Sequence, residues 1–572
     1  MAAALLILLG APVTVRSQDG SKIAWEDWSD GVFERSQREH KLVVLHLGAV
    51  WCHWCHVMEK MTYADPDVVK LVRKHFIAVH VDQDARPDLS NRYEEYGWPA
   101  TIIFDERGKE IVKRRGYIPP GPFLKLLEAV IADPTPGPSA QPRREPVFGA
   151  EAALTSELRG QLLGRWEAGY DAELGGWGKI QKYLDSDCIE LAMKKGKGAW
   201  AEQTLTAHLK LIDPVWGGAY QYSHGGVWDN PHFEKIMPFQ ADAIHAHLLN
   251  YLRTGSAASL DAARAVRRYL DTLLRNDDGI YFVSQDADLV KGDHAAEYFA
   301  LDDEGRRKLG IPRIDRHLYA RENGLAIKAL AELASASDDA DALKSALKAA
   351  AWALEKRALP EGGFRHDEKD PAGPYLGDTL AMGRAFFSLY TATADRVWLD
   401  RSAAAARFIE KTFAVREGPG YLTSRSSGPL PVVRQIDENT AVARWTSLLR
   451  AATKDESFRA MGERALRFLA SPDVALTRGM MTAGILLAEA ELASEPLKIT
   501  VVGKRGDPGA EALLREGRRS PEAFLIVELQ DGAGAYPMKE RASAYVCTAE
   551  ACKGPIFTPE DVKAAVARLA GR

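Results

Sequence analysis

The chain has 572 residues, of which 46% are apolar and 27% charged, as in an ordinary globular protein with several domains. A net charge of −5 supplies no basic surface, which argues against nucleic acid and anionic membranes as partners. The five cysteines, at positions 52, 55, 188, 547 and 552, are too few for a disulfide scaffold.

An apolar run opens the chain over residues 1–13 and is too short to cross a bilayer, which takes about 20 residues. It matches the core of a signal peptide, with Val15 and Ser17 as small residues before a cut at Gln18, although no Lys or Arg precedes it. We therefore predict a signal peptide over 1–17 and a secreted or periplasmic protein. A mis-assigned start, which would mean a cytoplasmic protein, and a buried helix are the alternatives. No other stretch resembles a membrane span.

Residues 22–132 alternate between strand-like and helix-like segments. The strand-like runs lie at 42–47, 76–81, 101–104 and 110–113, and a helix is expected at 120–132. This alternation predicts an α/β domain whose sheet is partly parallel and carries helices on both faces. Five prolines between 133 and 147 then predict an extended linker.

From 148 to 493 the pattern changes to long helices rich in Ala and Leu. Loops that pair glycine with an aromatic residue recur between them, as in Gly176-Trp177, Gly363-Phe364 and Gly420-Tyr421. Helix pairs with similar loops predict repeated hairpins that close into an all-α toroid, with a generic helical array as the alternative. Residues 494–572 again mix strands and helices and predict a small α/β appendage.

The spacing Cys52-His53-Trp54-Cys55 places a dithiol between a predicted strand and a predicted helix. The free N–H groups of a helix start stabilise a thiolate, so Cys52 would attack a disulfide and Cys55 would resolve the mixed intermediate. Pro99 stands where a cis-proline loop would face the dithiol. This hypothesis requires a helix that begins at the pair and a pair that is open to solvent.

Three other readings of the dithiol stay open. Cys52 to His56 also fits the C-x-x-C-H pattern of haem attachment, and Cys52 and Cys55 with His53 or His56 could bind zinc. An inert structural pair is the third. Our prediction is a redox pair with no metal and no cofactor.

Side chains near the dithiol have candidate supporting roles. His53 would favour the thiolate and Trp54 would offer an apolar docking surface, unless one ring merely packs and the other is solvated. Asp82 is either a proton carrier or, more commonly, a helix cap. Cys547 and Cys552 would form a second disulfide or receive electrons from the first, with a structural loop or two unlinked thiols as alternatives, and Cys188 is expected to be a small buried hydrophobe.

The helical region also contains a candidate pocket. Trp228, His232 and Glu234 are close in sequence, and Asp286 and Asp288 follow. Aromatic rings that stack on sugars and two carboxylates would suit glycoside hydrolysis. Packing of the rings at a rim and capping by the acids are the plainer interpretation, and ligand or protein binding is favoured over catalysis.

Several segments together resemble a known family. Residues 51–58 (WCHWCHVM), 81–88 and Trp98-Pro99 are similar to the spermatogenesis-associated thioredoxin-domain proteins, and further similar segments follow in the same order at 231–236, 284–288 and 544–547. The resemblance adds Trp51 to the residues around the dithiol. It implies a thioredoxin-like domain joined to a six-hairpin-glycosidase-like (α/α)6 toroid.

The sequence therefore predicts a multidomain chain: a thioredoxin-like domain, an (α/α)6 toroid and a small α/β segment. We expect a thiol–disulfide oxidoreductase that acts on protein thiols or disulfides, with a toroid that binds a partner, a carbohydrate or another polymer. One alternative is a carbohydrate-binding or carbohydrate-processing toroid with an accessory thioredoxin-like domain. The other is a scaffold with vestigial cysteines.

Overall fold

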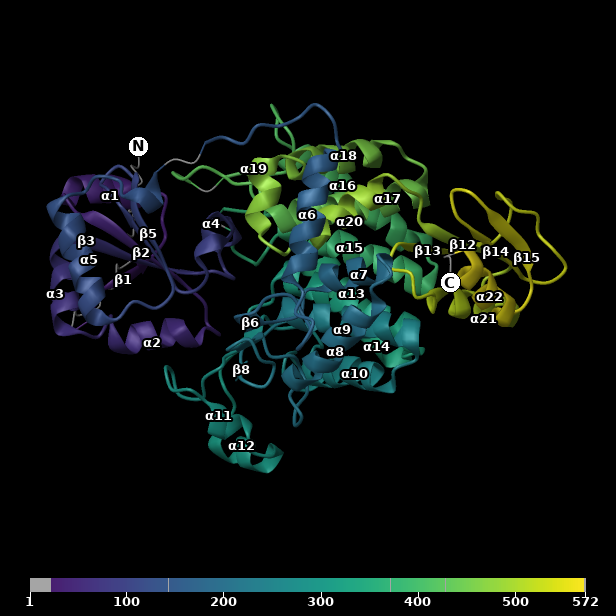
Figure 1. Ribbon diagram of the computed structural model, residues 1–572, viewed down its shortest axis with the longest axis horizontal. Coiled ribbons are helices and arrows are strands. Elements are labelled where there is room, and N and C mark those ends of the chain that lie inside the picture. Colours follow the sequence, from purple (N-terminus) through teal and green to yellow (C-terminus); the bar gives the residue numbers. More distant parts are fainter. Residues whose placement is uncertain (1–21, 142–143, 371, 427, 570–572) are drawn as a thin grey trace, which may run out of the picture.

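The computed structural model describes residues 22–141, 144–370, 372–426 and 428–569. Three units lie in a row along the longest axis of the molecule (Figure 1). An α/β unit stands at one end, a helical ring in the middle and a second α/β unit at the other end. The predicted signal peptide lies outside the described residues.

The first unit is a five-stranded sheet in the order β1-β3-β2-β4-β5. β1 and β2 are parallel to β3, whereas β4 is antiparallel to β2 and β5. The strands are β1 (Trp25–Asp27), β2 (Leu42–Gly48), β3 (Phe76–Asp82), β4 (Ala100–Phe104) and β5 (Glu110–Arg115). The helices are α1 (Val32–Glu39), α2 (His53–Met61), α3 (Pro66–His75), α4 (Pro87–Tyr93) and α5 (Pro120–Ala132).

Both faces of this sheet are covered because its central strands are apolar on both sides. Side chains of α1 and α4 pack on one face, and side chains of α2, α3 and α5 pack on the other. The peptide bond between Trp98 and Pro99 is cis. Part of the predicted linker is not extended: Pro138–Ala140 forms a 3-10 turn, and the N–H of Gly137 donates to the carbonyl of Ile111 on β5.

The middle unit is a closed ring of helical hairpins, which together with the first unit confirms the predicted fold class. Six inner helices each contact the next around the ring: α7 (Ser186–Lys194), α9 (Met237–Thr254), α13 (Ala320–Ser337), α15 (Leu376–Thr393), α17 (Ile436–Thr453) and α20 (Ala483–Leu492). Six outer helices pack around them: α6 (Ser156–Gly169), α8 (Gly198–His208), α10 (Ala257–Thr272), α14 (Ala340–Lys356), α16 (Arg396–Phe413) and α18 (Ser457–Leu469).

The loops that lead into the inner helices gather at one mouth of the ring. They contain short paired strands and short helices: β6 (Gln181–Lys182), β7 (Tyr222–His224), β8 (Pro231–His232), β9 (Lys235–Ile236), β10 (Ser284–Gln285), β11 (Ile314–Asp315), α11 (Ala296–Phe299), α12 (Asp303–Leu309) and α19 (Pro472–Ala475). The predicted glycine–aromatic loops are these turns. At Gly217 a side chain would lie 2.0 Å from the carbonyl oxygen of Ala265, so only glycine fits.

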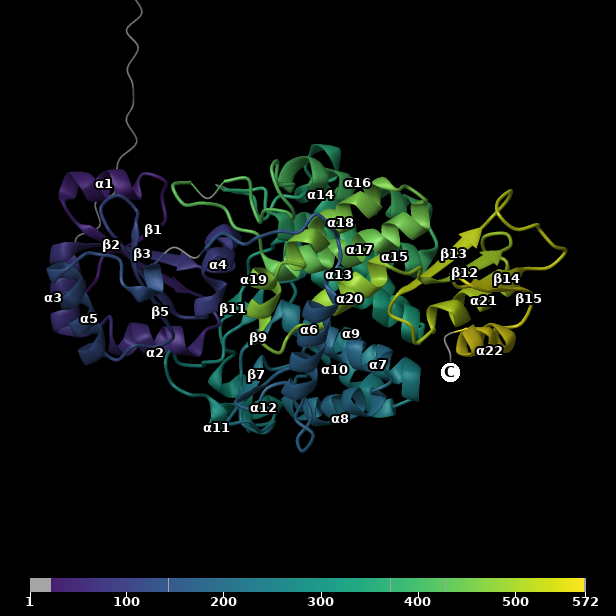
Figure 2. The same cartoon turned by 45° about the horizontal axis from the view of Figure 1, so that its top comes forward.

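The third unit has the sheet order β13-β12-β14-β15 with two helices in contact with each other. Its elements are β12 (Leu497–Val502), α21 (Pro508–Arg518), β13 (Leu525–Gln530), β14 (Ser543–Cys547), β15 (Cys552–Ile556) and α22 (Pro559–Leu569). Arg505 and Arg518 donate to carbonyl groups at the carboxyl end of α15. The unit therefore lies at the far mouth of the ring, opposite the first unit (Figure 2).

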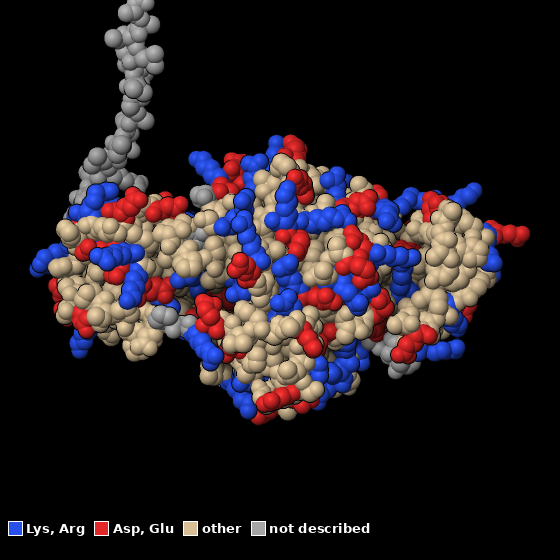
Figure 3. All heavy atoms as spheres, turned by 90° about the horizontal axis from the view of Figure 1, so that it is seen from above, with Lys and Arg blue, Asp and Glu red and all other residues tan. Residues whose placement is uncertain are grey.

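On the face that Figure 3 shows, acidic and basic side chains are interspersed rather than gathered into a patch of one sign, in keeping with the small net charge. Within the described part of the chain, none of the helices combines the length and the hydrophobicity that a bilayer crossing requires.

The mouth loops contain a fully buried cluster of charges. The carboxylate of Asp213 lies 2.7 Å from both Lys235 Nζ and Arg306 Nη1, and all three side chains are inaccessible to solvent. Replacing Asp213 with Ala would leave two buried cations uncompensated, and we expect a loss of about 3–5 kcal/mol in the free energy of unfolding. Denaturant unfolding of the full chain checks this.

The control is Asp229→Ala, which removes an ion pair between largely exposed side chains. It should cost no more than about 1 kcal/mol. Equal effects of the two changes would contradict the assignment of Asp213 as a buried counter-charge.

Candidate functional site

The dithiol sits at the start of α2. Cys52 is the N-cap of the helix, and its Sγ accepts the N–H of Cys55 at 3.1 Å. Cys52 and Cys55 form a disulfide. Trp98, which precedes the cis-proline Pro99, packs in the same small apolar cluster as both cysteines. A helix therefore begins at the pair, as the spacing predicts.

The expectation that the pair is open to solvent is wrong for this state of the molecule. Cys52 is 3% exposed and Cys55 is 1% exposed. The toroid covers them: Ile236 of β9 and Phe239 of α9 belong to the apolar cluster that contains the dithiol. The first unit thus presents its reactive end to the mouth of the ring, not to solvent.

Charged groups surround the covered dithiol. His53 Nδ1 lies 2.6 Å from Asp288 Oδ1, and His56 Nδ1 lies 3.1 Å from Asp288 Oδ2 and 3.5 Å from Asp286 Oδ1. The backbone N–H of His53 points to Glu234 Oε1 at 3.4 Å. The structure thus brings four of the predicted residues together across the junction of the units, namely His53, Glu234, Asp286 and Asp288, and adds the imidazole of His56.

The pKa values of this cluster follow from its burial and its pairing. Burial alone would lower the pKa of His53, but Asp288 raises it. Burial opposes ionisation of Asp288, yet hydrogen bonds from His53 and His56 lower its pKa to about 2. Burial raises the pKa of Asp286 to about 7. Within the cluster, Asp288 is thus the acid that the imidazoles keep ionised.

A second set of contacts holds the two units together around Asp84, which follows β3. Trp51 Nε1 donates to Asp84 Oδ2 at 2.8 Å. On the toroid side, His366 Nε2 donates to the carbonyl of Asp84 at 2.7 Å, while His366 Nδ1 lies 2.9 Å from Asp378 Oδ1. Burial would lower the pKa of His366, but Asp378 raises it to about 9.

Other predicted residues have different surroundings. Asp82 accepts the N–H of Asp84, and its pKa is raised by burial and by Asp315 of the toroid, not by the cysteines. Trp54 is 38% exposed and stacks on Tyr117. Trp228 donates to the carbonyl of Leu174 and is buried beside Gly176 and His208.

The remaining cysteines lie apart from the first dithiol. Cys547 and Cys552 form a disulfide between β14 and β15, and Cys188 is buried in the toroid. Figures 1 and 2 place β14 and β15 at the opposite end of the molecule from α2. In this arrangement the two pairs are therefore too far apart for direct exchange within one chain.

Two histidines near the disulfide were not among the predicted supporting residues, although His56 was named as an alternative zinc ligand. His56 falls on the same face of α2 as His53, a spacing of three that helical periodicity reveals. His46 of β2 is fully buried, and a side chain placed on Gly48 would lie 3.0 Å from His46 Nε2 and 3.5 Å from Cys55 Sγ. Burial lowers the pKa of His46 to about 3, so this imidazole is neutral and a poor acceptor for a thiol proton.

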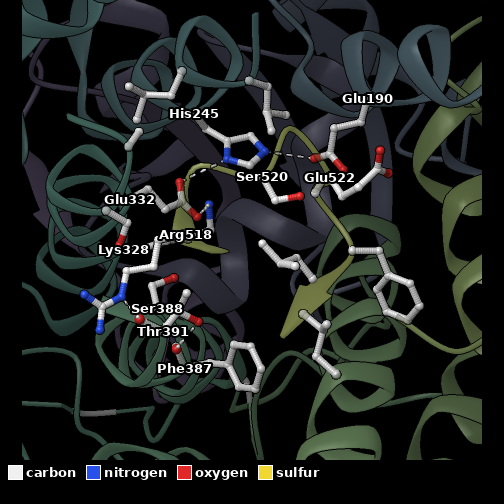
Figure 4. A pocket seen from close by; sticks show the side chains of 18 of the residues that line it. Glu190, His245, Lys328, Glu332, Phe387, Ser388, Thr391, Arg518, Ser520 and Glu522 are labelled. Carbon is white, nitrogen blue, oxygen red and sulfur yellow. Dashed lines mark hydrogen bonds and ion pairs between the residues drawn. The ribbon is translucent and has the colours of Figure 1, made fainter. Parts of the chain in front are cut away.

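The far mouth holds a second polar site, a cavity of about 190 Å³ (Figure 4). His245 lies 3.0 Å from carboxylate oxygens of both Glu190 and Glu332. Burial would lower its pKa, but the two carboxylates raise it to about 9. Ser520 and Arg518 of the third unit close the cavity. The acids here are paired, so we assign them to the stability of the ring.

Comparison with known proteins finds similarity in the first unit and over a longer part of the chain. Residues 12–130 match the family model Thioredox_DsbH, described as a protein of unknown function, DUF255. Spermatogenesis-associated protein 20 of Homo sapiens is 23% identical over 307 residues, which cover 46% of this chain and 39% of that protein. Thiol:disulfide interchange protein DsbD 2 of Pseudomonas aeruginosa is 35% identical over 99 residues, 16% of this chain and 17% of that protein.

Solved structures resemble separate parts of the chain. A D-mannose isomerase has a TM-score of 0.45 at 13% identity, and the match covers 61% of this chain and 99% of the isomerase chain. A cellobiose 2-epimerase from Bacillus thermoamylovorans has a TM-score of 0.42 at 14% identity, with 55% and 87% covered. The chain spans less than half the length of the curated relatives above. The predicted resemblance to the spermatogenesis-associated thioredoxin-domain proteins is confirmed.

Proposed function

We propose that the chain is a thiol–disulfide exchange protein whose dithiol reacts when the thioredoxin-like unit leaves the mouth of the toroid. The observation that carries the proposal is a disulfide at the N-cap of α2, beside a cis-proline loop, in a thioredoxin-like sheet. The similarity to a thiol:disulfide interchange protein over the same unit supports it. The partners we expect are protein thiols or disulfides.

The chemistry would follow from the helix start. In the reduced chain the thiolate of Cys52 attacks a substrate disulfide, which breaks as one substrate sulfur leaves as a thiolate. The thiol of Cys55 loses its proton to water and attacks Cys52 Sγ. The second substrate thiolate then departs, and two electrons have passed from the dithiol to the substrate.

Burial of the disulfide supports a protective role for the toroid. A macromolecular substrate cannot reach Cys52 and Cys55, which are 3% and 1% exposed, because Ile236 and Phe239 pack against them. The toroid would therefore block the surface on which a substrate protein would dock. Its release, not the reactivity of the thiols, would limit exchange.

Carbohydrate binding at the toroid mouth is the weaker candidate. Glu234, Asp286 and Asp288 do converge, and the ring of Tyr222 stacks on His232. These groups are covered by α2, so a sugar would need the same opening of the two units. Nothing in their arrangement favours a sugar over a peptide.

Weakening the junction should expose the dithiol. We expect Ile236→Asp to speed reduction of the Cys52–Cys55 disulfide by a small phosphine about ten-fold or more, since loss of about 1.4 kcal/mol of docking free energy gives that factor. Mass spectrometry after alkylation of the freed thiols measures the rate. The same variant should gain insulin-reducing activity that Cys52→Ser abolishes.

A matched control is Val397→Asp, which places the same charge on a side chain of α16 that is 44% exposed. It should leave the rate of reduction unchanged. Equal rates for the wild type and Ile236→Asp would show that docking does not protect the disulfide, and the proposal would fail.

Docking should also depend on pH through His366. The protonated ring donates to Asp378 and to the carbonyl of Asp84 at once, whereas the neutral ring has a single N–H to donate. The other charged groups that face the ring are Asp370, Glu322 and Arg321. Its contribution should be complete below pH 6.5 and disappear as the pH rises through about 9.

The measurement is the difference in free energy of unfolding between the wild type and His366→Gln across this range. The difference should shrink by at most about 3 kcal/mol, since each pKa unit is worth about 1.4 kcal/mol. A difference that stays constant from pH 6 to 10 would show that His366 is not charged in the folded chain.

A further inference from the structure

The two histidines of α2 and the two aspartates after β10 form a set of groups that is suited to a metal ion. We propose that His56, Asp286 and Asp288 bind a divalent transition-metal ion, with His53 as a positioning residue. One ligand comes from the thioredoxin-like unit and two come from the toroid. This site stands on its own geometry and does not depend on thiol–disulfide exchange.

The ligand atoms already have the spacing that such a site needs. Metal–ligand bonds of about 2.1 Å at tetrahedral angles put neighbouring ligand atoms about 3.4 Å apart. His56 Nδ1 is 3.1 Å from Asp288 Oδ2 and 3.5 Å from Asp286 Oδ1. The three ligand atoms all lie within 4.8 Å of one another. One N–H of His56 can satisfy one carboxylate, yet the nitrogen faces two.

The carboxylates are held in place by other groups. Asp286 Oδ1 accepts the backbone N–H of Asp288 at 3.0 Å, and Asp288 Oδ2 accepts that of Gly292 at 2.8 Å. His53 Nδ1 lies 2.6 Å from the remaining oxygen, Asp288 Oδ1. Such outer contacts orient metal ligands in known sites and tune their affinity. The site would therefore need little rearrangement to load.

A separate observation supports a cation at this place. Glu234 is 3% exposed, and its Oε2 has no hydrogen-bond partner among the described residues, although it lies beside His53. Three buried carboxylates, Glu234, Asp286 and Asp288, thus face two imidazoles. A divalent ion would balance this excess of negative charge. The ligand set leaves a fourth position for water.

The chemistry of the donors selects the ion. One imidazole and two carboxylates suit Zn²⁺, Mn²⁺ or Fe²⁺ rather than ions that prefer sulfur. With Cys52 and Cys55 joined in a disulfide, their sulfurs are not thiolate ligands. The ion would connect the two units beside the disulfide, since His56 directly follows Cys55, and so stabilise the closed state.

Calorimetric titration of the chelator-treated, oxidised full chain with Zn²⁺ tests the proposal. We expect one site per chain and at least a ten-fold loss of affinity in His56→Ala, Asp286→Asn and Asp288→Asn. The isosteric Asn variants keep the test valid if the Ala variant folds poorly. His53→Gln should weaken binding without abolishing it.

The control variant is His80→Ala, which breaks a second group of His46, Glu59 and His80 on the thioredoxin-like unit. It should keep the high-affinity site.

Co²⁺ should give absorption bands of nitrogen and oxygen ligands without a sulfur charge-transfer band. Binding that survives Asp286→Asn and Asp288→Asn, or no binding by the wild type, would overturn the proposal. A sulfur charge-transfer band that Cys52→Ser removes would show that the ion binds the cysteines instead.

Discussion

The contact between α2 and the loop after β10 is the constraint on which the arrangement of the first two units depends. His53 follows Cys52 directly, so the ion pair of His53 with Asp288, at 2.6 Å, can form only when the start of α2 lies against the toroid. The same approach brings Ile236 and Phe239 onto the sulfurs. Docking of the two units and concealment of the disulfide are therefore one event, not two.

Because of this coupling, separation of the two units would control access both to the dithiol and to the carboxylates at the mouth of the toroid. Movement of α2 off the mouth would free the dithiol and uncover Glu234, Asp286 and Asp288 together. The buried charges suit such an equilibrium, because the cost of desolvating them offsets much of their attraction. They specify one docked geometry, while the packing of Ile236 on the cluster that contains Trp51 and Trp98 adds favourable burial of apolar surface.

Local patterns were enough to predict the elements. The apolar run of β2, the cysteine spacing and the glycine–aromatic loops each depend on a few neighbouring residues, and the structure has the strand, the helix start and the turns there. The partners of α2 could not be predicted, because Asp288 is 235 residues from His53 and periodicity gives the face of a helix but not what covers it. Trp228 shows the same limit. Its closeness to Glu234 in sequence does not reveal its contacts, which are with Leu174 and Gly176.

The position of the second disulfide limits where electrons can go. Exchange requires an attacking sulfur to touch a disulfide sulfur. The inner helices that separate the outer units have up to 18 residues, about 27 Å at 1.5 Å per residue. Cys547 and Cys552 lie beyond the far mouth, which the third unit closes with Arg505 and Arg518. In this arrangement the sulfurs of the two pairs do not meet. The toroid therefore lies between the two disulfides and covers the first of them.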